Sequence, residues 1–278
     1  MRRLFTTLII LSFALAAEAQ EVIRVLAIGN SFSQDMVEQN LHEIGRDEGT
    51  TIIVGNLYIG GCTLQKHLKN IRGNKSAYSY RKIGPDGKRV VTKNYSISRA
   101  LTDEAWDYIM VQQQSGLSGV YASYGRYLPE IMKYLRENAP QSAKYIILQP
   151  WAYQGDSDHA QFAIYNHDQM AMYKSITKSV KRIFTDSRYG FHAVIPAGTA
   201  IQNGRTSRLG DHLTRDGYHL HKGIGRYIGA CTMCEVLLGR QLKASGYAPS
   251  SVSREDAALA RRAAHVAVVK PWRVTKIK

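Results

Sequence analysis

Two short segments far apart in the chain carry residue types that together could perform nucleophilic catalysis. Ser31 follows an apolar run that ends in Gly29-Asn30, and Asp216 stands three residues before His219 near the other end of the chain. A serine hydroxyl is a weak nucleophile at neutral pH, so it needs a general base, and that base needs an orienting partner. The two segments therefore predict a Ser-His-Asp hydrolase with Ser31 as nucleophile, His219 as base and Asp216 as orienting acid.

The predicted position of Ser31 suits this chemistry. Residues 24–28 are typical of a buried strand, so Ser31 would lie at the carboxyl end of a strand and at the N-terminus of a helix. Open α/β sheets bind ligands at this edge, and a helix N-terminus favours an oxyanion that forms beside the serine. Two plainer interpretations stay open. Ser31 could serve only as a helix cap, and His219 could be a structural loop residue.

The hydrophobic pattern predicts the elements that would position these residues. Five mostly apolar runs are typical of parallel strands buried on both faces, at residues 23–28, 51–58, 108–112, 145–148 and 192–195. Helical patterns also occur, at residues 33–46, 121–138, 160–184, 222–238 and 253–268. Alternating strands and helices predict the α/β class, with a doubly wound parallel sheet and helices on both of its faces.

The N-terminus and the net charge indicate where the protein acts and on what. Residues 1–19 have a basic start, an apolar stretch and a small-residue cleavage site, so they read as a secretory signal peptide. We expect an exported protein, periplasmic or secreted, in which residues 20–278 form a single domain with no membrane insertion. The net charge of +15 favours anionic partners. For an exported protein we expect an acidic polysaccharide and no nucleic acid.

More than half of this positive charge lies in one segment. Residues 66–93 hold nine Lys or Arg and one acid, and Gly84-Pro85-Asp86-Gly87 is a strong turn signal between two β-like runs. We predict a basic β-hairpin insertion at about residues 66–98 that bears Tyr78 and Tyr80 as a rim beside the site. Tyrosine rings stack on sugars, and cations pair with uronate carboxylates. The alternative is a solvated, mobile loop.

The three cysteines are too few for a disulfide framework. Cys231 and Cys234 have the spacing of a redox or metal-binding pair. They also share a helical face with apolar residues, which favours small core residues over redox or metal chemistry. The histidines and carboxylates show no convincing metal-ligand spacing. We therefore expect neither a metal nor another cofactor.

The chain resembles the SGNH, or GDSL-type, hydrolase superfamily and, within it, the DUF4886 family of exported bacterial proteins. Gly29-Asn30-Ser31 is similar to the first block of the superfamily, where Gly-Asp-Ser is usual, and Asp216-Gly217-Tyr218-His219 matches the last. Strings such as WDYIMVQQQS and RDGYHLHKGIGRY extend the resemblance over residues 29–227. It implies a three-layer flavodoxin-like fold around a central parallel sheet of about five strands. Some proteins in that neighbourhood act as carbohydrate esterases, including on methyl-esterified pectin.

The resemblance also implies an oxyanion hole with three donors. The first is the backbone N–H of Ser31, and the second is that of a glycine after the second strand, for which we choose Gly61. The third is usually an asparagine side chain after the third strand. Three glutamines stand there instead, and we assign the role to Gln113 or Gln114, whose amides can donate in the same way. Loss of such a donor costs about 100- to 1000-fold in rate.

Three further residues follow the fourth and fifth predicted strands and could contact substrate, namely Trp151, Gln202 and Arg205. Roles in the core or in loops are equally compatible with their positions. The main hypothesis is an exported serine esterase that removes acetyl or methyl-ester decorations from a polysaccharide, with an acidic plant glycan such as pectin favoured by the basic segment. The alternatives are a non-catalytic glycan-binding module that retains the fold, and a flavodoxin-like binder of a nucleotide or FMN.

Overall fold

A seven-stranded sheet forms the centre of the molecule, with strand order β4-β3-β2-β1-β5-β6-β7. The computed structural model describes residues 21–244 and 246–278, so the predicted signal peptide lies outside the described residues. Five strands pair in parallel and coincide closely with the five predicted apolar runs. They are β1 (Glu21–Gly29), β2 (Thr50–Tyr58), β5 (Tyr108–Val111), β6 (Lys144–Leu148) and β7 (Ala193–Ile195). The predicted α/β class with a central parallel sheet is confirmed.

The predicted hairpin exists, but it extends the main sheet instead of standing apart from it. β3 (Tyr78–Ile83) pairs antiparallel with β2, and β4 (Arg89–Tyr95) pairs antiparallel with β3. The turn between them contains Gly87, whose φ of 75° is a backbone conformation that favours glycine. The first part of the basic segment is not in the hairpin at all, because it forms the helix α3 (Leu64–Arg72).

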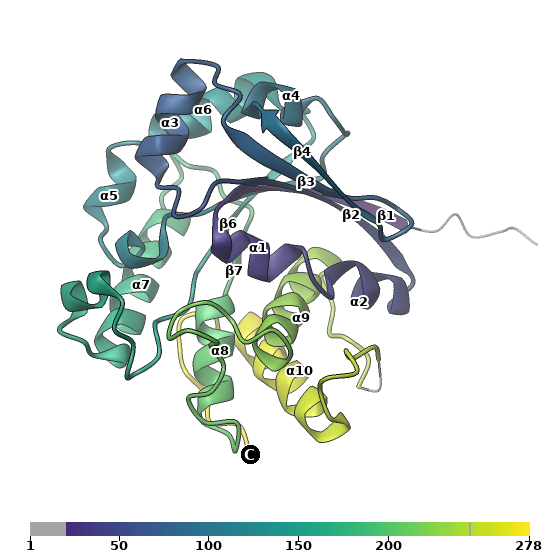
Figure 1. Cartoon of the computed structure of the whole chain (residues 1–278), viewed down its shortest axis with the longest axis vertical. Coiled ribbons are helices and arrows are strands. Elements are labelled where there is room, and N and C mark those ends of the chain that lie inside the picture. The colour runs from purple at the N-terminus through teal and green to yellow at the C-terminus, as the bar shows by residue number, and fades with distance from the viewer. Residues whose placement is uncertain (1–20, 245) are drawn as a thin grey trace, which may run out of the picture.

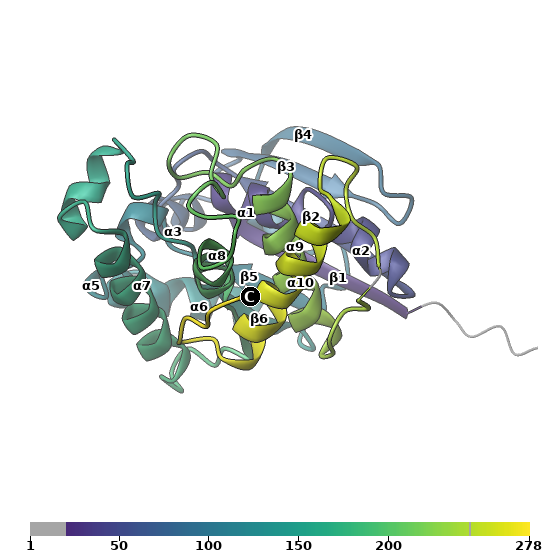
Figure 2. The ribbon, with the colours of Figure 1, turned by 90° about the horizontal axis from the view of Figure 1, so that it is seen from below.

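Helices cover both faces of the sheet and give three layers. Figure 1 shows α3, α4 (Ile97–Leu101) and α6 (Leu128–Asn138) on one side of the sheet. On the other side lie α1 (Ser31–Val37), α2 (Leu41–Asp47), α9 (Ile224–Leu238) and α10 (Arg254–Val269). Figure 2 shows α9 and α10 running side by side over the sheet. The remaining helices are η1 (Ser115–Leu117), α5 (Ala122–Gly125), η2 (Ala160–Tyr165), α7 (Gln169–Phe184) and α8 (Ala197–Arg205).

Three predicted helices are each split into two, for identifiable backbone reasons. Asn40 separates α1 from α2 with a φ of 65°, and Asn166 separates η2 from α7 with a φ of 55°. A left-handed residue cannot continue a right-handed helix, and asparagine tolerates this conformation better than most residues. Pro129 lies in the first turn of α6, where its missing N–H costs nothing, and it separates α6 from α5.

Cys231 and Cys234 lie on α9 and are fully buried, as the core interpretation predicts. Burial raises the pKa of the Cys231 thiol to about 12, so the thiol stays neutral and unreactive at ordinary pH. Throughout residues 21–244 and 246–278, no helix combines the length and the apolar character that crossing a membrane requires.

Candidate active site

The carboxyl ends of three parallel strands and one loop before α9 meet around a single cavity of about 350 Å³. Ser31 follows β1 as the first residue of α1, Gly61 follows β2, and Gln114 follows β5. His219 and Arg215 come from the loop that precedes α9. The structure thus brings the predicted nucleophile and the predicted base to the same cavity, although they are far apart in the sequence.

Asp216 and His219 form the pair that the sequence spacing predicts. The Nδ1 atom of His219 lies 2.7 Å from Oδ2 of Asp216, and Oδ1 of Asp216 accepts a hydrogen bond of 2.8 Å from the backbone N–H of His219. A carboxylate at Nδ1 favours the tautomer that leaves Nε2 as a proton acceptor. Partial burial acts to raise the pKa of Asp216, but the hydrogen bonds from His219 outweigh it and lower that pKa.

The loop that carries this pair is anchored to the helix of the nucleophile by Asp35, which lies one turn after Ser31. Asp35 is fully buried and accepts hydrogen bonds from Nη1 of Arg215 at 2.9 Å, Nε of Arg226 at 2.8 Å and the backbone N–H of Leu220 at 2.9 Å. These donors come from the two sides of His219. The buried carboxylate therefore fixes the predicted base relative to the predicted nucleophile.

Trp151 also supports this loop and does not line the cavity. Its ring is fully buried and stacks on Phe32 with ring centroids 4.1 Å apart, and its Nε1–H donates to the carbonyl of Tyr218 at 2.6 Å. Of the two interpretations of Trp151, the core role is the one that the structure shows. Its hydrogen bond ends on the residue directly before His219, so it still contributes to the placement of the base.

Asn30, and not Ser31, is the N-cap of α1. Its Oδ1 atom accepts a hydrogen bond of 3.0 Å from the backbone N–H of Phe32. The helix-cap interpretation of Ser31 is therefore wrong. Among the described residues, the Ser31 hydroxyl makes no hydrogen bond, including none to His219. The hydrogen bond between a catalytic serine and its general base is often too long in the absence of substrate, and it shortens when substrate binds.

Asn30 also joins three loops around the predicted oxyanion hole, a role that the sequence reasoning missed. Its Nδ2–H donates to the carbonyl of Cys62 at 3.0 Å, and its Oδ1 accepts from Nε2 of Gln112 at 2.7 Å. The strand ends of β1, β2 and β5 are thereby tied together. Gly61, directly before Cys62, has a φ of 60°. In the described chain, the backbone N–H groups of Ser31 and Gly61 make no hydrogen bond, so both can donate to an oxyanion.

The structure distinguishes the two glutamines that the sequence left open. Gln113 is buried, its Oε1 accepts from the backbone N–H of Leu64 at 3.0 Å, and its Nε2 donates to Ser123. Gln114 lines the cavity, and its Nε2 donates to Oε1 of Gln161 at 2.6 Å. The same Nε2 also donates to Oγ of Ser115 at 3.5 Å, a long contact that a substrate oxygen in the cavity can replace. The assignment to Gln113 is wrong, and Gln114 remains the candidate.

Gln202 and Arg205, predicted to contact substrate, lie away from the cavity lining. Nε2 of Gln202 donates to Oε1 of Gln169 at 3.1 Å, and the Arg205 guanidinium, only 4% exposed, pairs with Asp211 at 2.6 Å. Gln202 thus ties α8 to the start of α7. Arg205 holds the loop after α8, because a buried cation requires a carboxylate partner. The prediction that they bind substrate is wrong, and their alternative loop role fits.

Tyr78 and Tyr80 are likewise buried and do not form a rim beside the site. The Tyr78 hydroxyl lies 2.9 Å from Nδ1 of His67, and the Tyr80 hydroxyl donates to Oδ2 of Asp103 at 2.7 Å. Pairing of β3 with the main sheet turns these side chains into the core, where their hydroxyl groups need polar partners. The two tyrosines therefore stabilise the hairpin on the sheet instead of contacting sugar.

His159 and Arg215 are among the cavity side chains that were not predicted as site residues. Nδ1 of His159 accepts from the backbone N–H of Gln161 at 3.2 Å, so Nε2 carries the hydrogen and can donate. Burial, and secondarily the neighbouring His219, lower the pKa of His159, which keeps it neutral near pH 7. Arg215 places a cation in the same cavity. Because Arg215 directly precedes Asp216 in the sequence, its position at the site could have been predicted.

The potential for metal binding is a separate question. Within the described parts of the chain, no three His, Cys, Asp or Glu side chains gather in a way that could hold a metal ion. The Asp216–His219 pair has only one carboxylate and one imidazole at hydrogen-bond distance. What this cavity offers chemically is a serine hydroxyl, an oriented imidazole and several N–H donors.

Comparisons with known proteins agree with this architecture. The sequence model of a family described as a domain of unknown function, DUF4886, matches residues 24–267. A crystal structure of a DUF4886 family protein from Bacteroides uniformis is 48% identical, with a TM-score of 0.90 over 92% of this chain and 98% of that one. A proposed SGNH hydrolase from Slackia heliotrinireducens is 20% identical, with a TM-score of 0.52 over 77% of this chain and 98% of that one. This second similarity concerns the fold alone. No curated protein matches. The chain belongs to the DUF4886 family and has the three-layer α/β fold of the SGNH hydrolases.

Proposed function

We propose that the protein is a serine esterase that hydrolyses acetyl or methyl-ester decorations on a polysaccharide. The observation that carries this proposal is the 2.7 Å contact between His219 and Asp216 in the loop beside the cavity that Ser31 and His219 line. An imidazole held at Nδ1 by a carboxylate presents Nε2 as a general base, which is the arrangement that activates a serine hydroxyl. The expected signal peptide supports action outside the cytoplasm, in the periplasm or the medium.

The proposed reaction uses only groups of this chain and water. Ser31 Oγ attacks the ester carbonyl carbon while His219 Nε2 takes the hydroxyl proton. The resulting oxyanion accepts hydrogen bonds from the N–H groups of Ser31 and Gly61 and from the Gln114 amide. The bond to the alcohol oxygen then breaks as His219 returns the proton to it. Water attacks the acyl-enzyme by the same route and releases the acid and free Ser31.

Arg215 and His159 are the proposed contacts to the remainder of the substrate. Nη1 of Arg215 is bound by Asp35, while its Nε atom lies 3.9 Å from Asp216, so the guanidinium sits between the core and the cavity. A cation at this point favours a sugar that carries a carboxylate near the ester. This supports an acidic glycan such as pectin over a neutral one. The neutral imidazole of His159 supplies a hydrogen-bond donor for a sugar hydroxyl.

Ester hydrolysis by the purified protein tests the proposal. Wild type and Ser31→Ala would be incubated with an aryl acetate, acetylated xylan and methyl-esterified pectin, and both acetate and methanol would be quantified. We expect release that depends on Ser31, with the released product naming the bond. Ser142→Ala is a matched control, because the Ser142 hydroxyl, like that of Ser31, makes no hydrogen bond within the described residues, and Ser142 lies before β6, outside the cavity lining.

The opposite outcome is equally informative. If folded wild-type protein releases neither acetate nor methanol from any of the three substrates, or if Ser31→Ala releases as much as wild type, the esterase proposal fails. Binding of pectin or xylan without release would then favour the glycan-binding module that retains the fold.

A further inference from the structure

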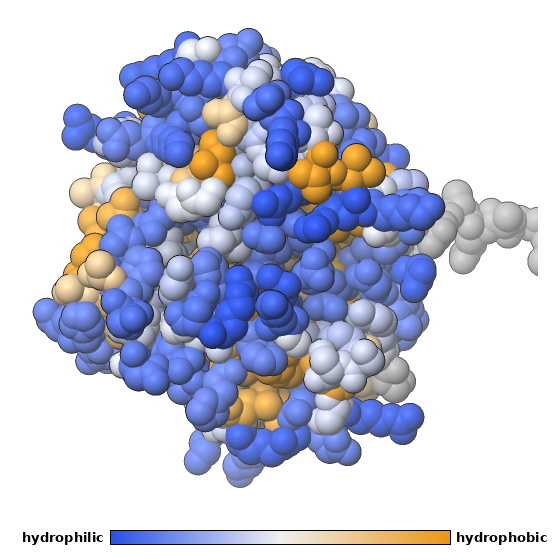
Figure 3. All heavy atoms as spheres, viewed as in Figure 1, coloured by the Kyte–Doolittle hydropathy of each residue, from blue (hydrophilic) through white to orange (hydrophobic). Residues whose placement is uncertain are grey.

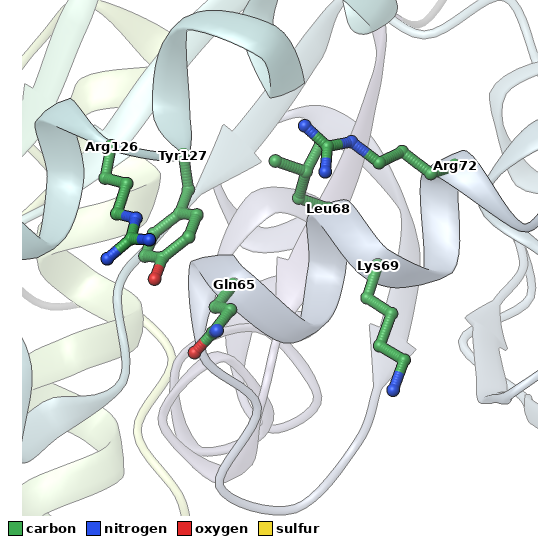
Figure 4. A pocket seen from close by; sticks show the side chains of 6 residues that line it. All are labelled: Gln65, Leu68, Lys69, Arg72, Arg126 and Tyr127. Atoms are coloured by element: carbon green, nitrogen blue, oxygen red, sulfur yellow. The ribbon is translucent and has the colours of Figure 1, made fainter.

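A second concave surface, the α3–α6 groove, lies outside the candidate active site. It has a volume of about 460 Å³ and is lined by Gln65, Leu68, Lys69, Arg72, Arg126 and Tyr127. Figure 4 shows the side chains of α3 on one side of this groove and those of Arg126 and Tyr127 on the other. The second wall is the junction of α5 and α6, because Arg126 ends α5 and Tyr127 caps α6.

The groove is cationic, and two of its cations have no acidic partner. Arg72 is bound at 2.7 Å by Glu130, which neutralises it. Within the described residues, neither Lys69 nor Arg126 forms an ion pair with a carboxylate, and both side chains are exposed. The hairpin differs in this respect. Its Arg81 and Arg89 both pair with Glu38. Lys82 and Lys88 also contact carboxylates, and of the hairpin cations only Lys93 has none within the described residues. The groove differs, because two of its three cations have no acidic partner there.

One end of the groove lies next to Gly61, in the part of the candidate active site that holds the predicted oxyanion hole. α3 starts three residues after Gly61, and Gln65 in its first turn lines the groove. Gln113 ties the two walls together at this end, because its Oε1 accepts from the backbone N–H of Leu64 and its Nε2 donates to Ser123 on α5. A chain that leaves the active-site cavity past Gly61 would thus run along α3 between Lys69 and Arg126.

We propose that the α3–α6 groove is a subsite for the carboxylates of an acidic oligosaccharide, bound beyond the sugar whose ester is cleaved. The groove offers two cations for carboxylates, the partly exposed Tyr127 ring for a sugar face, and the Gln65 amide for hydroxyl groups. A narrow groove suits a chain better than a flat anionic membrane. The face in Figure 3 shows apolar residues only in small separate patches. This inference rests on the proposed function, because only the proposed function makes the bound oligosaccharide a substrate.

Binding of an ester-free oligogalacturonate, measured by calorimetry at low salt, tests the subsite without requiring catalysis. The variant Lys69→Gln/Arg126→Gln removes two groove cations. The matched control Arg262→Gln/Lys270→Gln removes two exposed cations near the C-terminus. We expect the groove variant to bind about tenfold more weakly, the effect of two exposed ion pairs, and the control to bind like wild type. A neutral xylo-oligosaccharide should bind equally to all three proteins, and added salt should weaken only the acidic ligand.

Parallel hydrolysis of a small aryl acetate separates this inference from the proposed function. All three proteins should hydrolyse it at the same rate, because the groove does not touch the reacting groups. The subsite is refuted if the groove variant binds oligogalacturonate as tightly as wild type, or if the control loses as much affinity. It is also refuted if wild type binds anionic phospholipid vesicles but not the oligosaccharide. Groove-dependent binding by a protein that releases neither acetate nor methanol from aryl acetate, acetylated xylan or methyl-esterified pectin would refute the esterase and leave the subsite as a glycan-binding site.

Discussion

Asp35 and Glu38 lie three residues apart on α1 and at its C-cap, and both are buried carboxylates that bind two arginines. Asp35 accepts from Arg215 and Arg226, which come from the loop around His219 and from α9. Glu38 accepts from Arg81 and Arg89 of the hairpin, at 3.1 and 2.8 Å. The local chemistry is almost the same, but one carboxylate holds the predicted base and the other holds the sheet edge.

This difference shows that a buried ion-pair cluster does not by itself mark a functional site. Each cluster buries a carboxylate against arginines that remain partly exposed, and loss of those arginines would leave the buried charge uncompensated. Both clusters should therefore matter for stability. Only the cluster of Asp35 should matter for chemistry, because its partners lie on either side of His219 and one of them, Arg215, lines the cavity.

The largest expected effect is that of removing the proposed nucleophile, which lies on the same helix as the two carboxylates. Ser31→Ala should lower kcat on an aryl ester by at least about 10⁴-fold, because it removes the nucleophile. The midpoint of urea unfolding should stay within error of wild type, since the side chain makes no hydrogen bond within the described residues. If Ser31→Ala still hydrolyses the ester, Ser31 is not the nucleophile, and the link between the Asp35 cluster and catalysis is lost.

The second prediction compares the two carboxylates directly. Asp35→Asn and Glu38→Gln should each lower the free energy of unfolding by about 1.5–3 kcal/mol, because each weakens the charge-assisted hydrogen bonds between a buried carboxylate and its partly exposed arginines. Asp35→Asn should also lower kcat by about 100-fold through displacement of His219, whereas Glu38→Gln should leave the kcat of the folded protein nearly unchanged. Urea unfolding and initial rates measure the two quantities. Equal losses of kcat would show that the two clusters do not differ in function.

The third prediction concerns the N-cap of the same helix. Asn30→Asp keeps an acceptor for the N–H of Phe32 and for Gln112, but it replaces the donor to Cys62 with a carboxylate oxygen. Repulsion between that oxygen and the carbonyl of Cys62 should displace Gly61 and lower kcat by about 10- to 100-fold, with KM for a small ester nearly unchanged. If kcat is unaffected, the tie between Asn30 and Cys62 does not position the oxyanion hole.

The last expected effect concerns stability alone and arises at His67 on α3, which contacts Tyr78 of the hairpin. Burial lowers the pKa of His67 from 6.5 to about 3, so below pH 6.5 the unfolded chain binds a proton that the folded protein excludes. Stability should therefore fall as pH falls from 6.5 toward 3, by up to about 1.4 kcal/mol per pH unit from this residue.

His67→Gln tests this linkage, because glutamine can still hydrogen-bond the Tyr78 hydroxyl but does not titrate. Unfolding free energies measured by urea between about pH 6 and about pH 4 should decline less steeply in the variant than in wild type. Identical slopes would mean that His67 does not contribute to the acid sensitivity of the fold. Hydrolysis rates per folded molecule should not differ, because His67 lies outside the cavity lining.

Elements and contacts that depend on local pattern could be predicted from the amino-acid sequence. Five apolar runs of strand length correspond to the five parallel strands, because strands buried on both faces have few polar residues. The Asp216–His219 contact was also predictable, since a tight loop brings residues three apart within hydrogen-bond distance. The turn at residues 84–87 was recognisable from its glycines and proline.

Contacts between distant segments became apparent only from the packed fold. Arg215 and Asp35 are 180 residues apart, and nothing in the local sequence of either indicates the other. Tyr78 and Tyr80 are buried because β3 pairs with β2, a choice that the hairpin sequence alone does not make. Gln113 and Gln114 have the same chemistry and adjacent positions, yet one ties two helices and the other faces the cavity. Side-chain direction and pairing across the sheet are properties of the whole packed chain, so a one-dimensional pattern cannot specify them.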